Sequence, residues 1–147
     1  MYVIFGQMKK IILLIVSVIL FSCAGTGSKS DSYIPELDSG EEVSGKIFVM
    51  RDTGWTQGAQ VITVSLNGEE IGQLRPKQIV VEGSSNGDNE ILANYTGLAA
   101  VGVTGAEMTF KSDGSQNHYF LITQKDNFFG LTVVLSEVSG QTFRNTR

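Results

Sequence analysis

Hydrophobic and polar residues alternate along much of the chain after residue 45, and this pattern predicts β-strands. Within residues 61–67, the apolar side chains Ile62, Val64 and Leu66 are separated by polar ones, which is the period of two expected for a half-buried strand. The last residues, 139–147, are predicted to form a short helical turn or no regular structure. Patterns typical of strands also occur at residues 46–50, 69–74, 78–82, 90–95, 99–104, 107–110, 118–124 and 131–138, and strands are predicted there.

The turns between these strands predict how the strands are connected. Asn67-Gly68 stands between two alternating stretches, and this dipeptide is a strong hairpin signal because both turn residues adopt positive φ. Gly83 to Asn89 and Lys125 to Gly130 are runs of turn-forming residues. Seven or eight short strands separated by such turns predict an all-β fold, an antiparallel β-sandwich of immunoglobulin-like type, with a small β-barrel as the alternative.

The N-terminal segment has the pattern of a secretory signal peptide. Lys9 and Lys10 precede an apolar run, Ile11 to Phe21, that ends in small residues. The run is 11 residues long, whereas a membrane-spanning helix needs about 20 apolar residues. Residues 1–22 are therefore predicted to be a signal peptide, and Met8 is its expected true start because the segment before it adds nothing that such a signal requires.

Cys23, the single cysteine, is separated from the apolar run by Ser22 alone. The sequence Leu20-Phe21-Ser22-Cys23 resembles the lipoprotein box of bacterial lipoproteins. The resemblance implies that the Cys23 sulfur receives a diacylglycerol, that the peptide bond before it is cut and that the new amino terminus is acylated. Ala24 replaces the Asp that retains such lipoproteins at the inner membrane, so an outer-membrane anchor facing the periplasm is expected in a Gram-negative host. The alternative is an ordinary signal cut near Ala24.

The composition of the mature chain excludes some partners. Cleavage before Cys23 leaves 125 residues with 9 basic and 15 acidic side chains, a net charge of −6. Without a basic cluster, neither nucleic acid nor anionic lipid is expected as a partner, because both need a positively charged surface. Residues 23–45 are rich in Gly, Ser and acidic side chains and are predicted to form a flexible tether. Its 22 residues after Cys23 would reach about 26 Å. Residues 46–147 are predicted to form one β-sandwich domain.

Part of this domain resembles a family of small bacterial secreted proteins and lipoproteins of unknown function. The resemblance lies in "IFVMRDTGWTQGA", "VSLNGEEIGQL" and "YFLI", within residues 47–122. It implies a β-sandwich and no particular activity. Asn89 stands where the family has a histidine. The residues on the family pattern are Arg51, Gly54, Gly58, Gly68, Gly72 and Leu74.

Residues with catalytic or metal-binding chemistry are sparse. His118 is the single histidine, and with Cys23 assigned to lipid the chain lacks the residues of a nucleophilic triad or a usual zinc site. The protein is therefore not expected to be an enzyme or to carry a cofactor or metal, and His118 is interpreted as a strand-edge residue. Oxygen ligands for calcium occur together at Asn86, Asp88, Asn89 and Glu90, but their spacing is typical of an ordinary turn.

The predicted binding segment is the loop from Arg51 to Gly58, between two strands. It contains Trp55, the single tryptophan, and Arg51 and Asp52. Trp and Arg are enriched at interface hot spots. In the alternative, Trp55 packs inward and Arg51 binds loop carbonyls. The sequence thus predicts a non-catalytic, lipid-anchored envelope protein that binds a protein or glycan partner, with a structural or stress-related lipoprotein lacking a specific ligand as the alternative.

Overall fold

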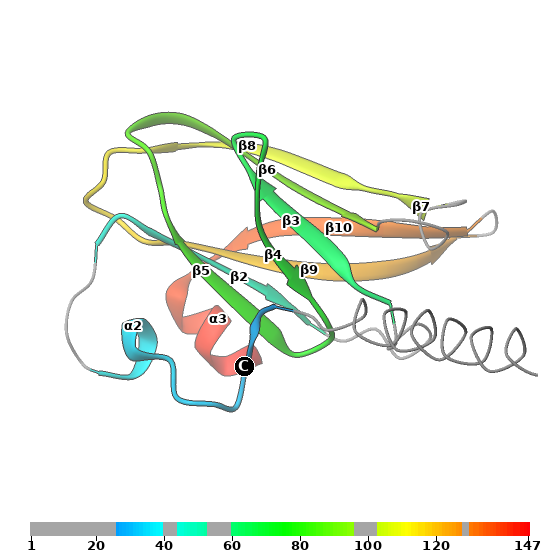
Figure 1. Ribbon diagram of the computed structural model, residues 1–147, viewed down its shortest axis with the longest axis horizontal. Coiled ribbons are helices and arrows are strands. Elements are labelled where there is room, and N and C mark those ends of the chain that lie inside the picture. Colours follow the sequence, from blue (N-terminus) through cyan, green and yellow to red (C-terminus); the bar gives the residue numbers. More distant parts are fainter. Residues whose placement is uncertain (1–25, 40–43, 53–59, 96–102, 128–129) are drawn as a thin grey trace, which may run out of the picture.

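The computed structural model describes residues 26–39, 44–52, 60–95, 103–127 and 130–147. Figure 1 shows two layers of strands with a short helix packed on one of them. The helices are α2 (Pro35–Asp38) and α3 (Gly140–Thr146). The strands are β1 (Ser28–Lys29), β2 (Lys46–Arg51), β3 (Ile62–Leu66), β4 (Glu69–Leu74), β5 (Gln78–Gly83), β6 (Gly87–Tyr95), β7 (Val103–Thr104), β8 (Ala106–Ser112), β9 (His118–Asn127) and β10 (Gly130–Val138).

The strands form two separate sheets, which confirms the predicted sandwich. One sheet has the order β1-β5-β2-β9-β10-β7 and the other β4-β3-β6-β8. Most neighbours are antiparallel, as predicted, but the six-stranded sheet also contains two parallel pairs, β2 with β9 and β10 with β7. A parallel pair needs a long crossover connection. The chain between β2 and β9 supplies it by building the whole of the second sheet.

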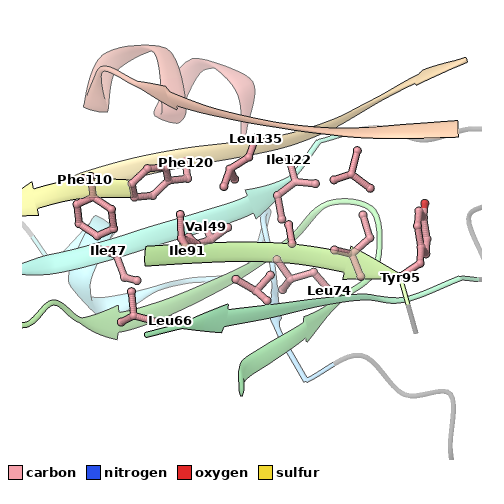
Figure 2. Close-up of a cluster of buried hydrophobic side chains, with 14 residues drawn as sticks. Ile47, Val49, Leu66, Leu74, Ile91, Tyr95, Phe110, Phe120, Ile122 and Leu135 are labelled. Atoms are coloured by element: carbon pink, nitrogen blue, oxygen red, sulfur yellow. The ribbon is translucent and has the colours of Figure 1, made fainter. Parts of the chain in front are cut away.

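The main core lies between the two sheets (Figure 2). Alternate residues of each strand point into it, so that Ile47 and Val49 of β2 face Ile62 and Val64 of β3. Burial of one such aliphatic or aromatic side chain contributes about 1.5 to 3 kcal/mol. The buried residues of this main core are Ile47, Val49, Ile62, Val64, Leu66, Leu74, Ile91, Ala93, Tyr95, Phe110, Phe120, Ile122, Val133 and Leu135.

A second core covers the outer face of the six-stranded sheet. Phe48 and Met50 of β2 point to this side and contact Phe143 of α3, and Ile34, just before α2, joins them. The ring of Phe48 stacks on Tyr119 with centroids 5.0 Å apart. Both faces of β2 are therefore buried, which explains why its apolar residues form a continuous run instead of alternating.

Residues 26–39 differ from the predicted flexible tether because they pack on the domain. Thr26 binds Gln73 through backbone and side chain, at 2.8 Å in each case. Further along, β1 pairs with β5 and Ile34 is buried in the second core. The Arg147 guanidinium binds the carbonyls of Ser30 and Ser32 and both carboxylate oxygens of Asp38. We call residues 26–39 together with Arg147 the clasp.

The clasp forms despite its polar composition because its hydrogen bonds satisfy the backbone groups of an otherwise irregular segment. A close approach also requires glycine at position 27. A Cβ atom there would collide with the Leu74 side chain and lie 3.0 Å from the Ile79 carbonyl oxygen. The sandwich domain therefore begins well before Lys46, the predicted boundary.

Acid should loosen the clasp at Asp38. The Arg147 guanidinium, and after it the Ile34 backbone N–H, lower the pKa of Asp38 from 3.8 to about 2. Because the folded-state pKa is depressed, the contribution to stability is complete above pH 3.8 and is lost as the pH falls through about 2. We expect Asp38→Asn to melt earlier than wild type near neutral pH and the difference to vanish in acid. A difference independent of pH, measured by thermal melts, would contradict this assignment.

The predicted hairpin at Asn67-Gly68 is confirmed. The two residues have φ of 53° and 84° and join β3 to β4. No atom lies within 4 Å of a Cβ built on Gly68, so a substitution there meets backbone strain and no clash. Gly68→Val should lower the unfolding free energy by about 1 to 3 kcal/mol. Gly68→Asn is the matched control, because Asn tolerates positive φ, and equal thermal midpoints for the two variants would contradict the expectation.

Candidate functional site

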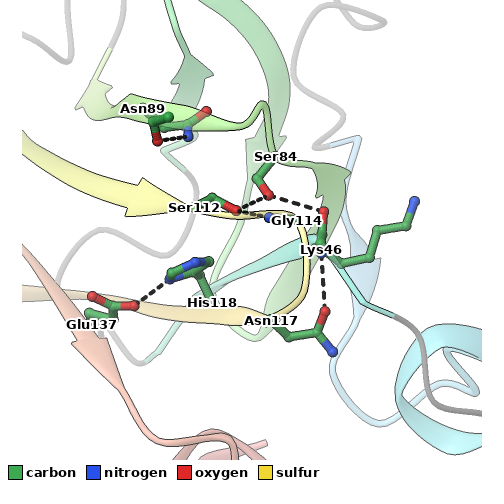
Figure 3. Close-up of polar contacts among 10 residues, drawn as sticks. Lys46, Ser84, Asn89, Ser112, Gly114, Asn117, His118 and Glu137 are labelled. Atoms are coloured by element: carbon green, nitrogen blue, oxygen red, sulfur yellow. Dashed lines mark hydrogen bonds and ion pairs between the residues drawn. The ribbon is translucent and has the colours of Figure 1, made fainter.

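A pocket of about 320 Å³, lined mostly by polar and charged residues, lies at the end of the sandwich where β6 and β9 begin and β8 ends. Figure 3 shows this region, with His118 between Glu137 and the turn that contains Gly114. We call this the His118 end and the opposite one, where β2 finishes, the Arg51 end. The residues that line the pocket are Gly87, Lys111, Ser112, Asp113, Gln116 and His118.

His118 is held in a fixed orientation. Its Nδ1 lies 2.7 Å from Oε1 of Glu137 on the neighbouring strand β10. Its ring packs against Phe110 and Phe120, with centroids 4.7 and 6.4 Å away. A carboxylate can only accept a hydrogen bond, so Nδ1 carries the proton and Nε2 is the acceptor of the neutral ring. The imidazole is therefore an oriented hydrogen-bonding group.

Ser112, which lines the pocket, belongs to a chain of hydrogen bonds behind it. Ser84 donates its one hydroxyl proton to the Gly45 carbonyl (3.1 Å), so the Ser112 hydroxyl must be the donor in the bond between the two serines (2.7 Å). The Ser112 oxygen also accepts from the Gly114 N–H (3.2 Å). Ser112 is 6% exposed. These contacts fix the ends of β5 and β8 relative to each other, and they leave the Ser112 hydroxyl proton engaged.

Charged side chains complete the pocket. Hydrogen bonds from the hydroxyl and backbone N–H of Ser115 lower the pKa of Asp113, so its carboxylate stays ionised at neutral pH. Lys111 lies 3.7 Å from Asp88, but both side chains are largely exposed and their ion pair is weak. An ammonium, a carboxylate and an imidazole thus line one small pocket. This set suits hydrogen bonding to a polar ligand.

Two of the four candidate calcium ligands are engaged with other partners. The Asn89 side chain turns inward and bonds the backbone of Ser85 and Gly87 and the amide of Asn67. Its neighbour Asp88 pairs with Lys111. Within the described ranges, no three His, Cys, Asp or Glu side chains gather as metal ligands would.

The predicted binding residues at the other end have different surroundings. Arg51 is fully buried, and its guanidinium donates to the carbonyls of Gln60 (2.5 Å) and Leu74 (3.1 Å) and to the Tyr95 hydroxyl (3.3 Å). Asp52 is partly exposed and bonds Lys77 at 2.9 Å. Trp55 lies outside the described residues. The structure thus separates Arg51 from the surface, and binding by Asp52 and Trp55 stays a prediction.

Sequence reasoning missed the pocket. The sequence indicates only a strand-edge role for His118, and it gives no functional signal at Lys111, near the end of β8, or at Asp113 and Gln116 in the polar turn that follows. The available signal was the stretch "KSDGSQNH" between two predicted strands, a turn that gathers several hydrogen-bonding side chains. Glu137, the partner of His118, is distant in sequence and meets this histidine only through the pairing of β9 with β10.

Cys23 and the rest of the predicted signal peptide also lie outside the described residues. Within the described part of the chain, no helix combines the length and apolar character needed to cross a membrane. Comparisons with models of protein families, with curated proteins and with solved structures found no match to this chain.

Proposed function

We propose that the chain is a lipid-anchored lipoprotein of the cell envelope whose β-sandwich binds a protein or glycan partner without catalysing a reaction. The anchor rests on Cys23 at the end of a signal-like segment. The observation that carries the binding role is the pocket at the His118 end, where three kinds of polar group surround about 320 Å³. In a Gram-negative host the protein is placed at the outer membrane, facing the periplasm.

The non-catalytic part of the proposal is supported by how the pocket groups are engaged. Nucleophilic catalysis needs a hydroxyl or thiol whose proton a neighbouring base can remove. The Ser112 hydroxyl is instead part of the chain that runs through Ser84 to the Gly45 carbonyl. The His118 ring bonds Glu137, and among the described residues no hydrogen bond joins this ring to the Ser112 hydroxyl. These contacts supply no activated hydroxyl nucleophile, which supports recognition as the proposed role.

The anchor is tested by Cys23→Ser. We expect this variant to remain an uncleaved precursor or to leave the membrane fraction, because each buried acyl methylene contributes about 0.8 kcal/mol to membrane binding. Mass spectrometry of the amino terminus of the wild-type protein is the direct measurement. An amino terminus other than acylated Cys23 would refute the lipoprotein assignment.

The pocket is tested by a matched pair of lysine variants. Lys111 lines the pocket, whereas Lys125 is an exposed lysine on the same domain at the Arg51 end. Lys111→Ala should weaken capture of envelope proteins or glycan fragments by the purified protein, and Lys125→Ala should not. Both variants should melt as wild type does. Equal capture by the two variants would refute the pocket as the binding site and favour the structural alternative without a specific ligand.

A further inference from the structure

The clasp fixes where the chain leaves the domain toward Cys23. Thr26 forms a hydrogen bond with Gln73 of β4. Across the four-stranded sheet, Gln73 is level with Thr63 of β3 and with Asn94, the residue before the last one of β6. Thr26 is therefore level with the Arg51 end of the sandwich. Cys23 stands three residues earlier in the sequence, and three residues span at most about 10 Å. A lipid on Cys23 would hold the domain within that distance of the bilayer surface.

The pocket lies at the far end of the same sandwich. Gly87, which lines it, is the first residue of β6, and Tyr95, the hydroxyl partner of Arg51, is the last. At about 3.3 Å a residue, the eight steps between Gly87 and Tyr95 correspond to roughly 26 Å. In Figure 1 the His118 end lies at the left and the Arg51 end at the right.

We infer that the clasp docks the Arg51 end of the sandwich on the lipid surface and directs the His118 pocket away from it. The inference rests on the proposed lipidation of Cys23. With residues 26–39 bound to the domain, the free segment between Cys23 and the domain spans three residues instead of the 22 of a free tether. Because this segment is short and leaves the domain at the Arg51 end, it holds that end closest to the headgroups.

The test places a single fluorophore at either end of the lipidated, full-length protein. Lipid occupies Cys23, so a maleimide dye reacts only with an introduced cysteine. Lys125→Cys reports on the Arg51 end. Glu82→Cys reports on the His118 end, because Glu82 pairs with Ile47, which pairs with His118. The protein is reconstituted in vesicles of anionic and zwitterionic phospholipids that contain a lipid with a nitroxide on its headgroup. We expect quenching at position 125 to be several-fold stronger than at position 82.

A clasp variant provides the control. Gly27→Leu places a side chain where Leu74 and the Ile79 carbonyl leave no room, so it should free residues 26–39 while the sandwich stays folded. The difference in quenching between the two positions should then shrink. Equal quenching at both positions in the acylated, clasped protein would overturn the inference alone. A protein whose amino terminus is not acylated Cys23 would overturn the proposed function and the inference with it.

Discussion

Replacing Arg51 with alanine is expected to lower the free energy of unfolding by roughly 2 to 5 kcal/mol. Arg51→Ala leaves the buried carbonyl of Leu74 and the partly buried carbonyl of Gln60 without this donor, and an unpaired buried carbonyl costs about 1 to 3 kcal/mol. The loss is offset in part, because the guanidinium is itself desolvated: burial lowers the pKa of Arg51. Chemical unfolding of the mature protein measures the effect.

Two variants separate the contributions of the Arg51 site. Tyr95→Phe removes only the hydroxyl that accepts from the guanidinium at 3.3 Å and should cost about 1 kcal/mol. Arg51→Lys keeps the charge but loses the planar fork that reaches several acceptors at once, so its stability should lie between that of Arg51→Ala and wild type. An Arg51→Ala protein that unfolds like wild type but no longer captures a partner would contradict the structural role and restore the predicted binding role.

The environment of Arg51 explains why a cation is tolerated in the interior. Its partners are two carbonyls, a hydroxyl and the face of the Tyr95 ring, whose centroid lies 5.7 Å from the guanidinium carbon. These groups tie the end of β2 to the end of β4, to Gln60 two residues before β3, and to the end of β6. Arg51 thus closes one end of the sandwich, which matches the alternative that the sequence left open for it.

The strands could be predicted because their signal is local. Alternation in β3 and the Asn67-Gly68 turn each lie within a few residues, and both are confirmed by the structure. Which strands become neighbours depends on pairing between distant segments, and no local pattern reports it. The parallel contact of β2 with β9 is such a case. The apolar run in β2 likewise predicts burial, but not which layer covers each face.

The clasp and the pocket were beyond prediction for a related reason. Residues 26–39 are polar enough to resemble a tether, and their order comes from acceptors and donors supplied by β4, β5 and Arg147. The carboxylate that orients His118 comes from β10, and the partners that hold Ser112 come from the turns at Gly45 and Ser84. Composition indicates how polar a segment is. Its partners are known only once the fold has brought them together.

Phe143→Ala is expected to have an effect of similar size to that of Arg51→Ala, roughly 3 to 5 kcal/mol, because it removes a large aromatic side chain from a core. Phe143 is fully buried and contacts Phe48 and Tyr119, with ring centroids 6.3 and 5.4 Å away. It is the buried side chain of α3, a short helix whose N-cap is Ser139. A helix of 7 residues is marginal on its own, so its packing holds it in place.

The consequence should reach beyond α3. Arg147, which holds the clasp, follows this helix directly, and the Thr146 carbonyl accepts from Lys77 at 2.9 Å. Hydrogen exchange at the Ser30 amide, which donates to Lys77, should therefore accelerate more in Phe143→Ala than amides of β3 do. Phe143→Leu, which keeps most of the apolar volume, is the control and should show a smaller effect on both measures. If Phe143→Ala speeded exchange equally at Ser30 and in β3, α3 would stabilise the sandwich as a whole and not the clasp in particular. Selective loss of protection at Ser30 would instead show that one buried ring, through α3 and Arg147, keeps the N-terminal segment on the domain.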